Sequence, residues 1–212
     1  MNPTFSIHQL ASVKGNRLLY KDIDFTLTAG NILYVQGANG TGKTTLLRTL
    51  CGLSKPLRGT VDWCGKSIYA LNEDYARDLF YLGHQAALQD DLTPLENLAF
   101  LLALVGEDMD DAEARRVLET LGLKHVLHLP VRLLSQGQKR RVSLARLWMQ
   151  NALLWILDEP YAALDAEAIR LLELRIKQFS EAGGIVVMTS HQALAMQTSQ
   201  LKHLSLDNSF EH

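Results

Sequence analysis

The chain has 212 residues and a formal net charge of −2, with 47% hydrophobic and 21% charged residues. These values are ordinary for a globular protein of one domain, and the charge balance argues against the broad basic surface that general binding to nucleic acid requires. The longest nearly apolar stretch, residues 98–106, is too short to span a bilayer, so any association with a membrane is expected to be peripheral.

Four short apolar runs are predicted to be buried parallel strands. They lie at residues 32–35, 79–82, 153–157 and 184–189. Each run is nearly continuous rather than alternating, as expected when helices cover both faces of a sheet. Helix-length patterns separate the runs, which predicts an α/β fold with a mostly parallel sheet. Two weaker candidates, residues 5–10 and 24–28, are expected to form an antiparallel edge, and the alternating tail at 201–206 is a candidate to close that edge.

The segment from about residue 86 to 150 is predicted to be helical throughout. Thr93 is expected to be an N-cap, with Glu96 completing a capping box, and Gly122 is expected to end a second amphipathic helix. The sequence therefore predicts one domain over residues 1–212. Its parts are a catalytic α/β core at about 1–85 and 151–206 and an inserted helical subdomain at about 86–150.

The stretch QGANGTGKTTLL, residues 36–47, follows the first predicted parallel strand and matches the P-loop pattern. Glycines let successive backbone N–H groups turn toward phosphate oxygens, and the helix that follows adds its N-terminal dipole. Lys43 is expected to reach the β- and γ-phosphates, and Thr44 to place its hydroxyl on Mg²⁺. The predicted nucleotide-binding residues are Gly37, Ala38, Asn39, Gly40, Thr41, Gly42, Lys43, Thr44 and Thr45.

Two acidic residues follow the apolar run at 153–157. A strand of this kind delivers Asp158 and Glu159 to the carboxyl edge of the sheet, where open α/β sheets bind their ligands. Asp158 is expected to hold Mg²⁺ through water, and Glu159 to accept a proton from the attacking water. By itself the pair also fits a solvated turn, and the P-loop decides in favour of the catalytic interpretation.

The stretch LLSQGQKRRVSLARLW indicates a second helix start that suits an anion. Ser135 is a good N-cap, Gln138 completes a capping box, and Gly137 leaves the first turn bare. One γ-phosphate does not need two helix N-termini from the same chain. The second N-terminus is therefore expected to come from another subunit.

With these motifs the chain resembles the ATP-binding cassette (ABC) ATPases over nearly its whole length. The stretch LSQGQ is similar to the signature of that family, usually LSGGQ, with Gln136 in place of the first glycine. Gln85 falls at the position of the Q-loop glutamine, Asp165 in AALD resembles the D-loop aspartate, and His191 resembles the switch histidine. Each of these three residues also has an ordinary structural interpretation, such as an N-cap role for Asp165. The order of the motifs along the chain favours the functional interpretation of all three.

The resemblance implies the cofactors, the catalytic groups and the assembly. ATP and Mg²⁺ are the expected cofactors, with ATP held between the P-loop of one subunit and the signature residues of a second copy. The catalytic residues that it implies are Lys43, Gln85, Glu159 and His191. The implied signature residues are Ser135, Gln136, Gly137 and Gln138, and the implied metal ligands are Thr44, Gln85 and, through water, Asp158.

The chain departs from the ABC pattern where that family often stacks an aromatic ring on adenine. Val13 and Lys14 stand at that position, with Arg17 close by. The resemblance therefore leaves adenine recognition to an apolar or guanidinium contact.

Finer resemblance points to the ATPase subunits of bacterial cytochrome c maturation systems. It rests on stretches such as YLGHQAALQDDLTPLENLAFL, LWILDEPYAALD and GGIVVMTSHQAL. It implies a peripheral subunit at the cytoplasmic face of the inner membrane, with integral membrane subunits as partners and hydrolysis tied to haem handling. The loop and helix after Gln85 are expected to be a buried part of the subdomain, the lining of a groove for a membrane partner, or both. Other ABC exporters and a non-transport ABC ATPase remain as alternatives, and no nucleic-acid partner is expected.

Overall fold

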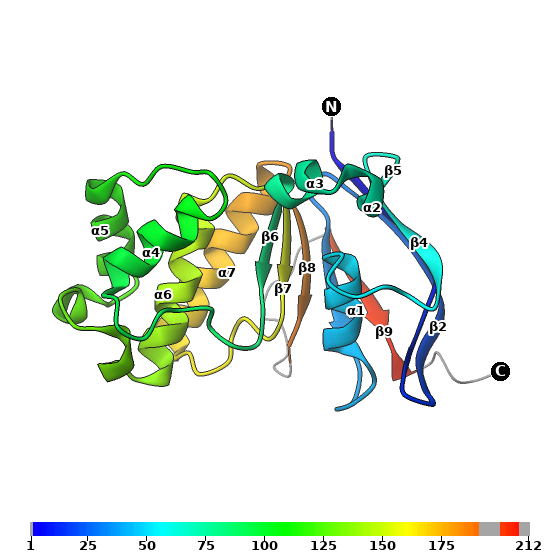
Figure 1. Cartoon of the computed structure of the whole chain (residues 1–212), viewed down its shortest axis with the longest axis horizontal. Helices are drawn as coiled ribbons and strands as arrows, with labels where there is room; N and C mark the ends of the chain where they lie inside the picture. Colours follow the sequence, from blue (N-terminus) through cyan, green and yellow to red (C-terminus); the bar gives the residue numbers. More distant parts are fainter. Residues whose placement is uncertain (1, 191–199, 208–212) are drawn as a thin grey trace. The chain divides into compact units, whose positions relative to one another are not determined.

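The computed structural model describes residues 2–190 and 200–207 (Figure 1). The chain divides into two compact units. The first, here called the sheet unit, contains Met1–Tyr81, Ala152–Pro160 and Gln178–His212. The second, here called the helical unit, contains Leu82–Asn151 and Tyr161–Lys177. The helical unit thus includes a segment that follows the strand at 154–157 as well as the region predicted to be helical.

A five-stranded sheet lies at the centre of the sheet unit, in the order β6-β7-β8-β3-β9. Its strands are β6 (Leu79–Leu82), β7 (Leu154–Leu157), β8 (Ile185–Thr189), β3 (Ile32–Gln36) and β9 (Leu201–Ser205). β3 pairs parallel with β8 and with β9, and β7 pairs parallel with β8. All residues of β7 and β8 are buried, which explains their continuous apolar sequences. The four predicted parallel-sheet strands are confirmed as strands.

A second sheet of the same unit is antiparallel, in the order β2-β1-β4-β5. Its strands are β1 (Thr4–Lys14), β2 (Arg17–Thr28), β4 (Arg58–Trp63) and β5 (Lys66–Ser67). The predicted antiparallel pair is confirmed. The prediction that the tail closes this edge is wrong, because β9 lies beside β3 in the other sheet. A parallel edge strand with exposed residues on one side alternates in sequence just as an antiparallel one does.

Helix α1 (Lys43–Leu50) packs into the core that the two sheets share. Its Leu46, Leu47 and Leu50 are fully buried among residues of both sheets, and Figure 1 shows the helix between β8 and β2. Burial of each leucine side chain contributes about 1.5–3 kcal/mol. This packing fixes the helix whose first residue is Lys43. Two short helices, α2 (Ile68–Leu71) and α3 (Glu73–Asp78), complete the unit together with the end of α7.

The helical unit has its own apolar core. Its helices are α4 (Pro94–Ala103), α5 (Asp111–Thr120), α6 (Gln136–Met149) and most of α7 (Ala166–Glu181), with two 3-10 turns at Lys124–Val126 and Val131–Leu133. Leu98, Leu118 and Val142 are fully buried in this core. The predicted capping box of Thr93 and Glu96 is confirmed. Among the described helices, none combines the length and the apolar character that a bilayer span requires.

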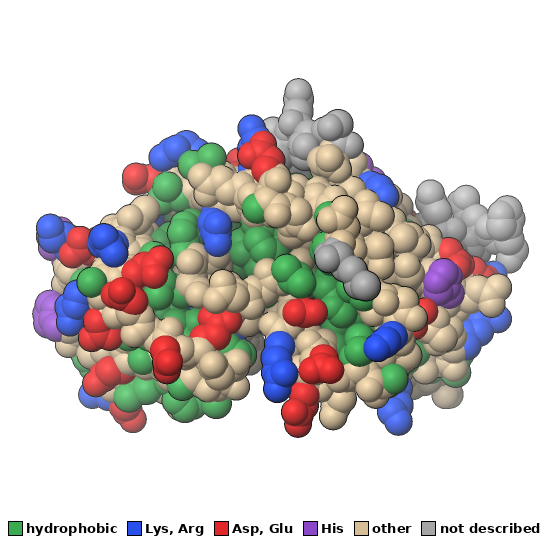
Figure 2. Space-filling view, turned by 90° about the horizontal axis from the view of Figure 1, so that it is seen from above, with side chains coloured by type: hydrophobic (Ala, Val, Ile, Leu, Met, Phe, Trp, Pro, Cys, Tyr) green, Lys and Arg blue, Asp and Glu red, His purple; other side chains and the backbone are tan. Residues whose placement is uncertain are grey.

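The surface carries charges of both signs. On the face seen in Figure 2, acidic and basic side chains are interspersed, in keeping with a net charge of −2.

Candidate functional site

The loop between β3 and α1 leaves a helix N-terminus open to an anion. Gly42 is the N-cap of α1, with a φ of 104°, and the helix start has no side-chain cap and no acidic residue in its first turn. A Cβ at Gly42 would lie 3.0 Å from the Cβ of Leu19. A side chain at this position would be strained by the backbone conformation and would crowd Leu19. The bare first turn presents N–H groups and the positive end of the helix dipole, the arrangement that binds phosphate.

Lys43 lies within this loop. Its Nζ donates to the carbonyl oxygens of Gly37, at 2.6 Å, and Ala38, at 3.2 Å. The hydroxyl of Thr41 also donates to the Ala38 oxygen, at 3.0 Å. The side chain of Lys43 thus folds back over the loop, so the loop and its cation form one hydrogen-bonded unit.

The two acids after β7 are held by a residue that sequence reasoning missed. The hydroxyl of Thr189, at the end of β8, donates to Oδ1 of Asp158 at 2.9 Å and accepts from the N–H of Glu159 at 3.0 Å. Asp158 is only 2% exposed. Glu159 has a φ of 50°, which is uncommon for a residue other than glycine. Thr189 therefore fixes the carboxylate of one acid and the backbone of the other.

The P-loop and the acidic pair belong to the same edge of the sheet unit. β3 precedes the loop, β7 precedes Asp158, and both strands pair parallel with β8. Because the carboxyl ends of parallel strands meet at one edge, the two groups follow strand ends on the same side of the sheet. The last described residue before the predicted switch histidine, Ser190, offers its carbonyl to the Tyr34 hydroxyl at 2.7 Å. His191 itself lies outside the described residues.

The signature segment of the helical unit forms the predicted capping box. The N–H of Gln138 donates to Ser135 Oγ at 3.2 Å, and the N–H of Ser135 donates to Gln138 Oε1 at 2.9 Å. A Cβ at Gly137 would lie 2.8 Å from the carbonyl oxygen of Ala163. The sequence suggested that glycine at position 137 keeps the first turn of α6 bare. The structure adds a steric reason for glycine there, because the backbone at Ala163 approaches it closely.

Asp165 and Gln85 also lie in the helical unit. Oδ1 of Asp165 accepts from the N–H of Ala168 at 3.0 Å, and its other oxygen pairs with the guanidinium of Arg141. The Ala168 N–H, and after it the Arg141 charge, lower the pKa of the Asp165 carboxyl below its ordinary value. The carboxylate therefore stabilises the start of α7, as its N-cap interpretation predicts.

The hairpin of β1 and β2 lies beside the P-loop at the position where the adenine contact is in question. Nη1 of Arg17 is 4.0 Å from the point that a Cβ on Gly40 would occupy. On the paired strand, Val13 is 42% exposed. The hairpin thus brings a guanidinium close to the phosphate loop, and Val13 and Lys14 stand on the strand that pairs with it.

The family model that matches the chain is the ABC transporter model, over residues 20–162. This range contains the P-loop, the signature segment and the acidic pair, and it covers more than half of the chain. The match confirms the resemblance drawn from the motifs.

Curated relatives match over nearly the full length. A protein of Nitrosospira multiformis is 44% identical, covering 96% of this chain and 99% of the relative. A Pseudomonas aeruginosa protein is 47% identical, covering 90% of this chain and 94% of the relative. A protein of Escherichia coli K12 is 42% identical, covering 93% of this chain and 94% of the relative. All three carry the name "Cytochrome c biogenesis ATP-binding export protein CcmA".

Solved structures agree on the fold. An ABC transporter ATP-binding protein from Pyrococcus furiosus superposes with a TM-score of 0.83 at 27% identity, over 97% of this chain and 98% of its own. A second structure, an ATP-binding subunit of an ABC transporter, superposes with a TM-score of 0.77 at 26% identity. The match covers 88% of this chain and 79% of that subunit. These likenesses confirm the predicted fold class, a P-loop α/β domain of ABC type, and with the family match they make the chain an ATPase. The chain belongs to the ABC transporter family, among its CcmA-like ATP-binding proteins.

Proposed function

We propose that the chain hydrolyses ATP as a Mg²⁺ complex in the loop between β3 and α1. The Thr44 hydroxyl and the Asp158 carboxylate supply oxygen donors, which suit this cation. The described residues contain no group of three or more His, Cys, Asp or Glu side chains that could cage a metal. Such a sparse donor set fits an ion that takes its remaining ligands from nucleotide phosphates and water.

The proposed roles of the other catalytic groups follow from charge and position. Lys43 would leave the loop carbonyls and neutralise the β- and γ-phosphates, since an ammonium binds phosphate more strongly than it binds a neutral carbonyl. Glu159 would orient and deprotonate the attacking water. Gln85 and His191 would complete the site as metal-sensing and γ-phosphate contacts.

We further propose that each site is completed by a second copy of the chain. Ser135, Gln136, Gly137 and Gln138 would face the γ-phosphate bound to the other copy. The first turn of α6 holds no acidic residue, so its dipole remains attractive to an anion. ATP would then close the dimer, and hydrolysis would release it, because the nucleotide binds the closed state better.

The proposed task is haem handling in cytochrome c biogenesis, at the cytoplasmic face of the inner membrane. The single observation that carries it is the identity of 42–47% with CcmA proteins over 90–96% of the chain. Integral membrane subunits would hold the cargo and receive the movement of the ATPase pair.

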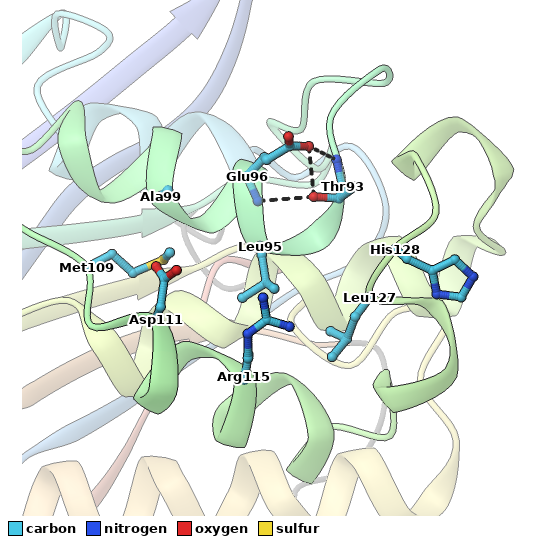
Figure 3. Close-up of a pocket in the computed structure, with 9 residues that line it drawn as sticks. All are labelled: Thr93, Leu95, Glu96, Ala99, Met109, Asp111, Arg115, Leu127 and His128. Carbon is cyan, nitrogen blue, oxygen red and sulfur yellow. Dashed lines mark hydrogen bonds between the residues drawn. The ribbon is translucent and has the colours of Figure 1, made fainter.

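The helical unit offers a surface for such a membrane subunit. A cavity of about 420 Å³ opens between α4, α5 and the turn at Leu127 and His128, with Leu95 and Met109 among its lining residues (Figure 3). Thr93 and Glu96 also line the cavity, and the hydrogen bonds of their capping box join them at the start of α4 (Figure 3). Asp111, Arg115 and His128 also line it, so the pocket offers both apolar and charged contacts to the side chains of a docked helix.

The test is an affinity purification of the tagged chain from detergent-solubilised native membranes, with mass spectrometry of the partners and haem absorbance read before and after ATP. We expect small multi-span proteins and a haem signal that changes with ATP. The Lys43→Ala chain is the matched control, since it should retain the partners without the ATP-dependent change. Haem-free membrane partners would assign the chain to another exporter, and ribosomal or nucleic-acid partners would contradict a transport role.

A further inference from the structure

The last strand of the chain ends against the phosphate loop. β9 pairs parallel with β3, with Leu204 opposite Val35 and Ser205 opposite Gln36. One residue further, the N–H of Leu206 donates to the Gln36 carbonyl at 2.9 Å. Leu206 is fully buried in the core of the sheet unit. Its Cβ lies 3.4 Å from the point that a Cβ on Gly37 would occupy, so the tail is anchored at the first glycine of the loop.

The next residue, Asp207, bonds directly to the loop. Its Oδ1 accepts a hydrogen bond from the N–H of Ala38 at 2.9 Å, although the two residues are 169 positions apart in sequence. The N–H of Asp207 in turn donates to Ser205 Oγ at 3.3 Å, which ties the Asp207 backbone to the end of β9. A hydrogen bond to an ionised carboxylate is among the stronger ones in proteins.

The peptide that Asp207 binds is the one that Lys43 binds from its other side. The Ala38 N–H and the Gly37 carbonyl belong to the same peptide group, and the Gly37 oxygen accepts from Lys43 Nζ at 2.6 Å. The described residues contain no cis peptide bond, and the N–H and C=O of a planar trans peptide point in opposite directions. Asp207 therefore lies on the face of the loop opposite to the Lys43 ammonium.

We infer that Asp207 is a positioning residue of the phosphate loop. Its carboxylate fixes the orientation of the Gly37–Ala38 peptide, so that the N–H groups after this peptide remain available to the nucleotide. Because it bonds from the outer face, it braces the loop without occupying the place of a phosphate. The inference deepens the ATP site of the proposed function and is independent of the cargo.

The loss of this bond should weaken nucleotide binding more than it slows chemistry. The Asp207→Ala chain should bind ATP about five- to tenfold more weakly, the size expected for a hydrogen bond to a partly solvated charged group. Its kcat at saturating ATP should stay within about twofold of wild type, since no reacting group is touched. Asp207→Asn keeps an acceptor oxygen in place and should restore binding to within about twofold of wild type.

The experiment measures ATP affinity by calorimetry, steady-state KM and kcat, and hydrogen exchange of the Ala38 amide, all on the full chain. Asp62→Ala is the matched control, because Asp62 lies in β4 and its carboxylate accepts a hydrogen bond from the nearby Thr60 hydroxyl at 3.3 Å. We expect faster exchange at Ala38 in Asp207→Ala and unchanged exchange in Asp62→Ala. A melting curve of each variant shows whether it is folded, and the exchange rate is read at a temperature where it is.

Three results would overturn the inference. The first is an Ala38 exchange rate that does not change in Asp207→Ala. The second is tighter ATP binding in both Asp207→Ala and Asp207→Asn, which would mean that the carboxylate repels the phosphates. The third is equal loss of affinity in the Asp62→Ala control. A wild-type chain that binds no ATP would instead contradict the nucleotide site itself, which keeps the two failures distinguishable.

Discussion

The two units of the chain differ in how they satisfy the N–H groups at the starts of their longer helices. In the helical unit, α4, α5 and α6 begin with side-chain caps from Thr93, Asp110 and Ser135. In the sheet unit, α1 begins at Gly42 with no side-chain cap. A capped start is complete within the chain, whereas an uncapped start needs a partner from outside. Among these longer helices, the start of α1 is therefore the one that leaves its N–H groups for a ligand, in keeping with the ATP site proposed there.

α6 is intermediate between these two kinds. Its start is capped by Ser135, yet its first turn has no acidic residue, whereas α4 has Glu96 and α5 has Asp111 and Glu113. Its dipole is therefore not neutralised by a nearby carboxylate in the first turn. A helix N-terminus needs both properties if it is to be stable in its own chain and also bind the phosphate of a nucleotide held by a second chain.

The largest effect is expected at the uncapped start. Lys43→Ala removes the cation of the phosphate loop and should reduce ATP turnover at least about 100-fold, as expected when a preorganised charge is lost from a transition state. Phosphate release is the measurement. Lys202→Ala is the control, because Lys202 is an exposed lysine of the same unit that donates to the Thr26 carbonyl. Turnover of Lys43→Ala within twofold of wild type would contradict the site assignment.

Thr189→Val tests how the acidic pair is held. The change keeps the shape of the side chain and removes the hydroxyl that bonds both acids. We expect kcat to fall about tenfold, with a smaller change in ATP affinity, because a general base is effective only within hydrogen-bonding reach. Thr189→Ser keeps the hydroxyl and should retain most of the activity. Equal rates for the two variants would show that the hydroxyl is not needed.

Gly137→Ala tests the close approach at the start of α6. In an ordinary helix this change stabilises by roughly 0.5–1 kcal/mol, but here the new Cβ meets the Ala163 carbonyl oxygen at 2.8 Å. We expect a destabilisation of about 1–3 kcal/mol instead, as for other overpacked sites. Denaturant unfolding measures the free energy, with Gln136→Ala at the neighbouring position as control. A stabilised Gly137→Ala protein would show that the close approach is absent in solution.

The smallest effect concerns the pH dependence of the capped starts. The Thr93 backbone and hydroxyl groups lower the pKa of Glu96, and backbone N–H groups of Glu113 and Ala112 lower the pKa of Asp110. A lowered folded-state pKa stabilises the fold above the unfolded-state value, and this stability is lost as the pH falls through the folded-state value. Melting temperature should therefore decrease below about pH 4.5. The melting temperature of the Glu96→Gln variant should decrease less steeply as the pH falls. An identical pH dependence in the variant and the wild type would show that Glu96 makes no such contribution.

Local signals in the sequence predicted the capped and uncapped starts. The P-loop, the capping boxes of Thr93 and Ser135 and the stop at Gly122 depend on residues within a few positions of one another, and all are present. The four buried strands were also predictable, because helices on both faces leave a continuous apolar run.

The remaining features depend on pairing between distant segments. The place of β9, the bridge from Thr189 and the bond from Asp207 to Ala38 follow from strand register, which no local pattern encodes. β4 was missed for a related reason, since only Val61 and Trp63 of its six residues are buried. The roles of all the predicted site residues stay predictions. This applies to Lys43, Thr44, Asp158 and Glu159 as much as to Gln85, Asp165, His191 and the signature residues.

The central claim is that the uncapped start of α1 in one chain and the capped start of α6 in another share one nucleotide. The most direct test is to measure the molar mass of the Glu159→Gln variant by light scattering with and without ATP. This substitution should allow ATP binding and stop ATP hydrolysis. We expect the 23.7 kDa chain to double in mass with ATP, and the double variant Glu159→Gln, Ser135→Arg to remain monomeric. ATP-loaded Glu159→Gln that stays monomeric even with its membrane partner, or a dimer that forms equally well with Ser135→Arg, would contradict the claim.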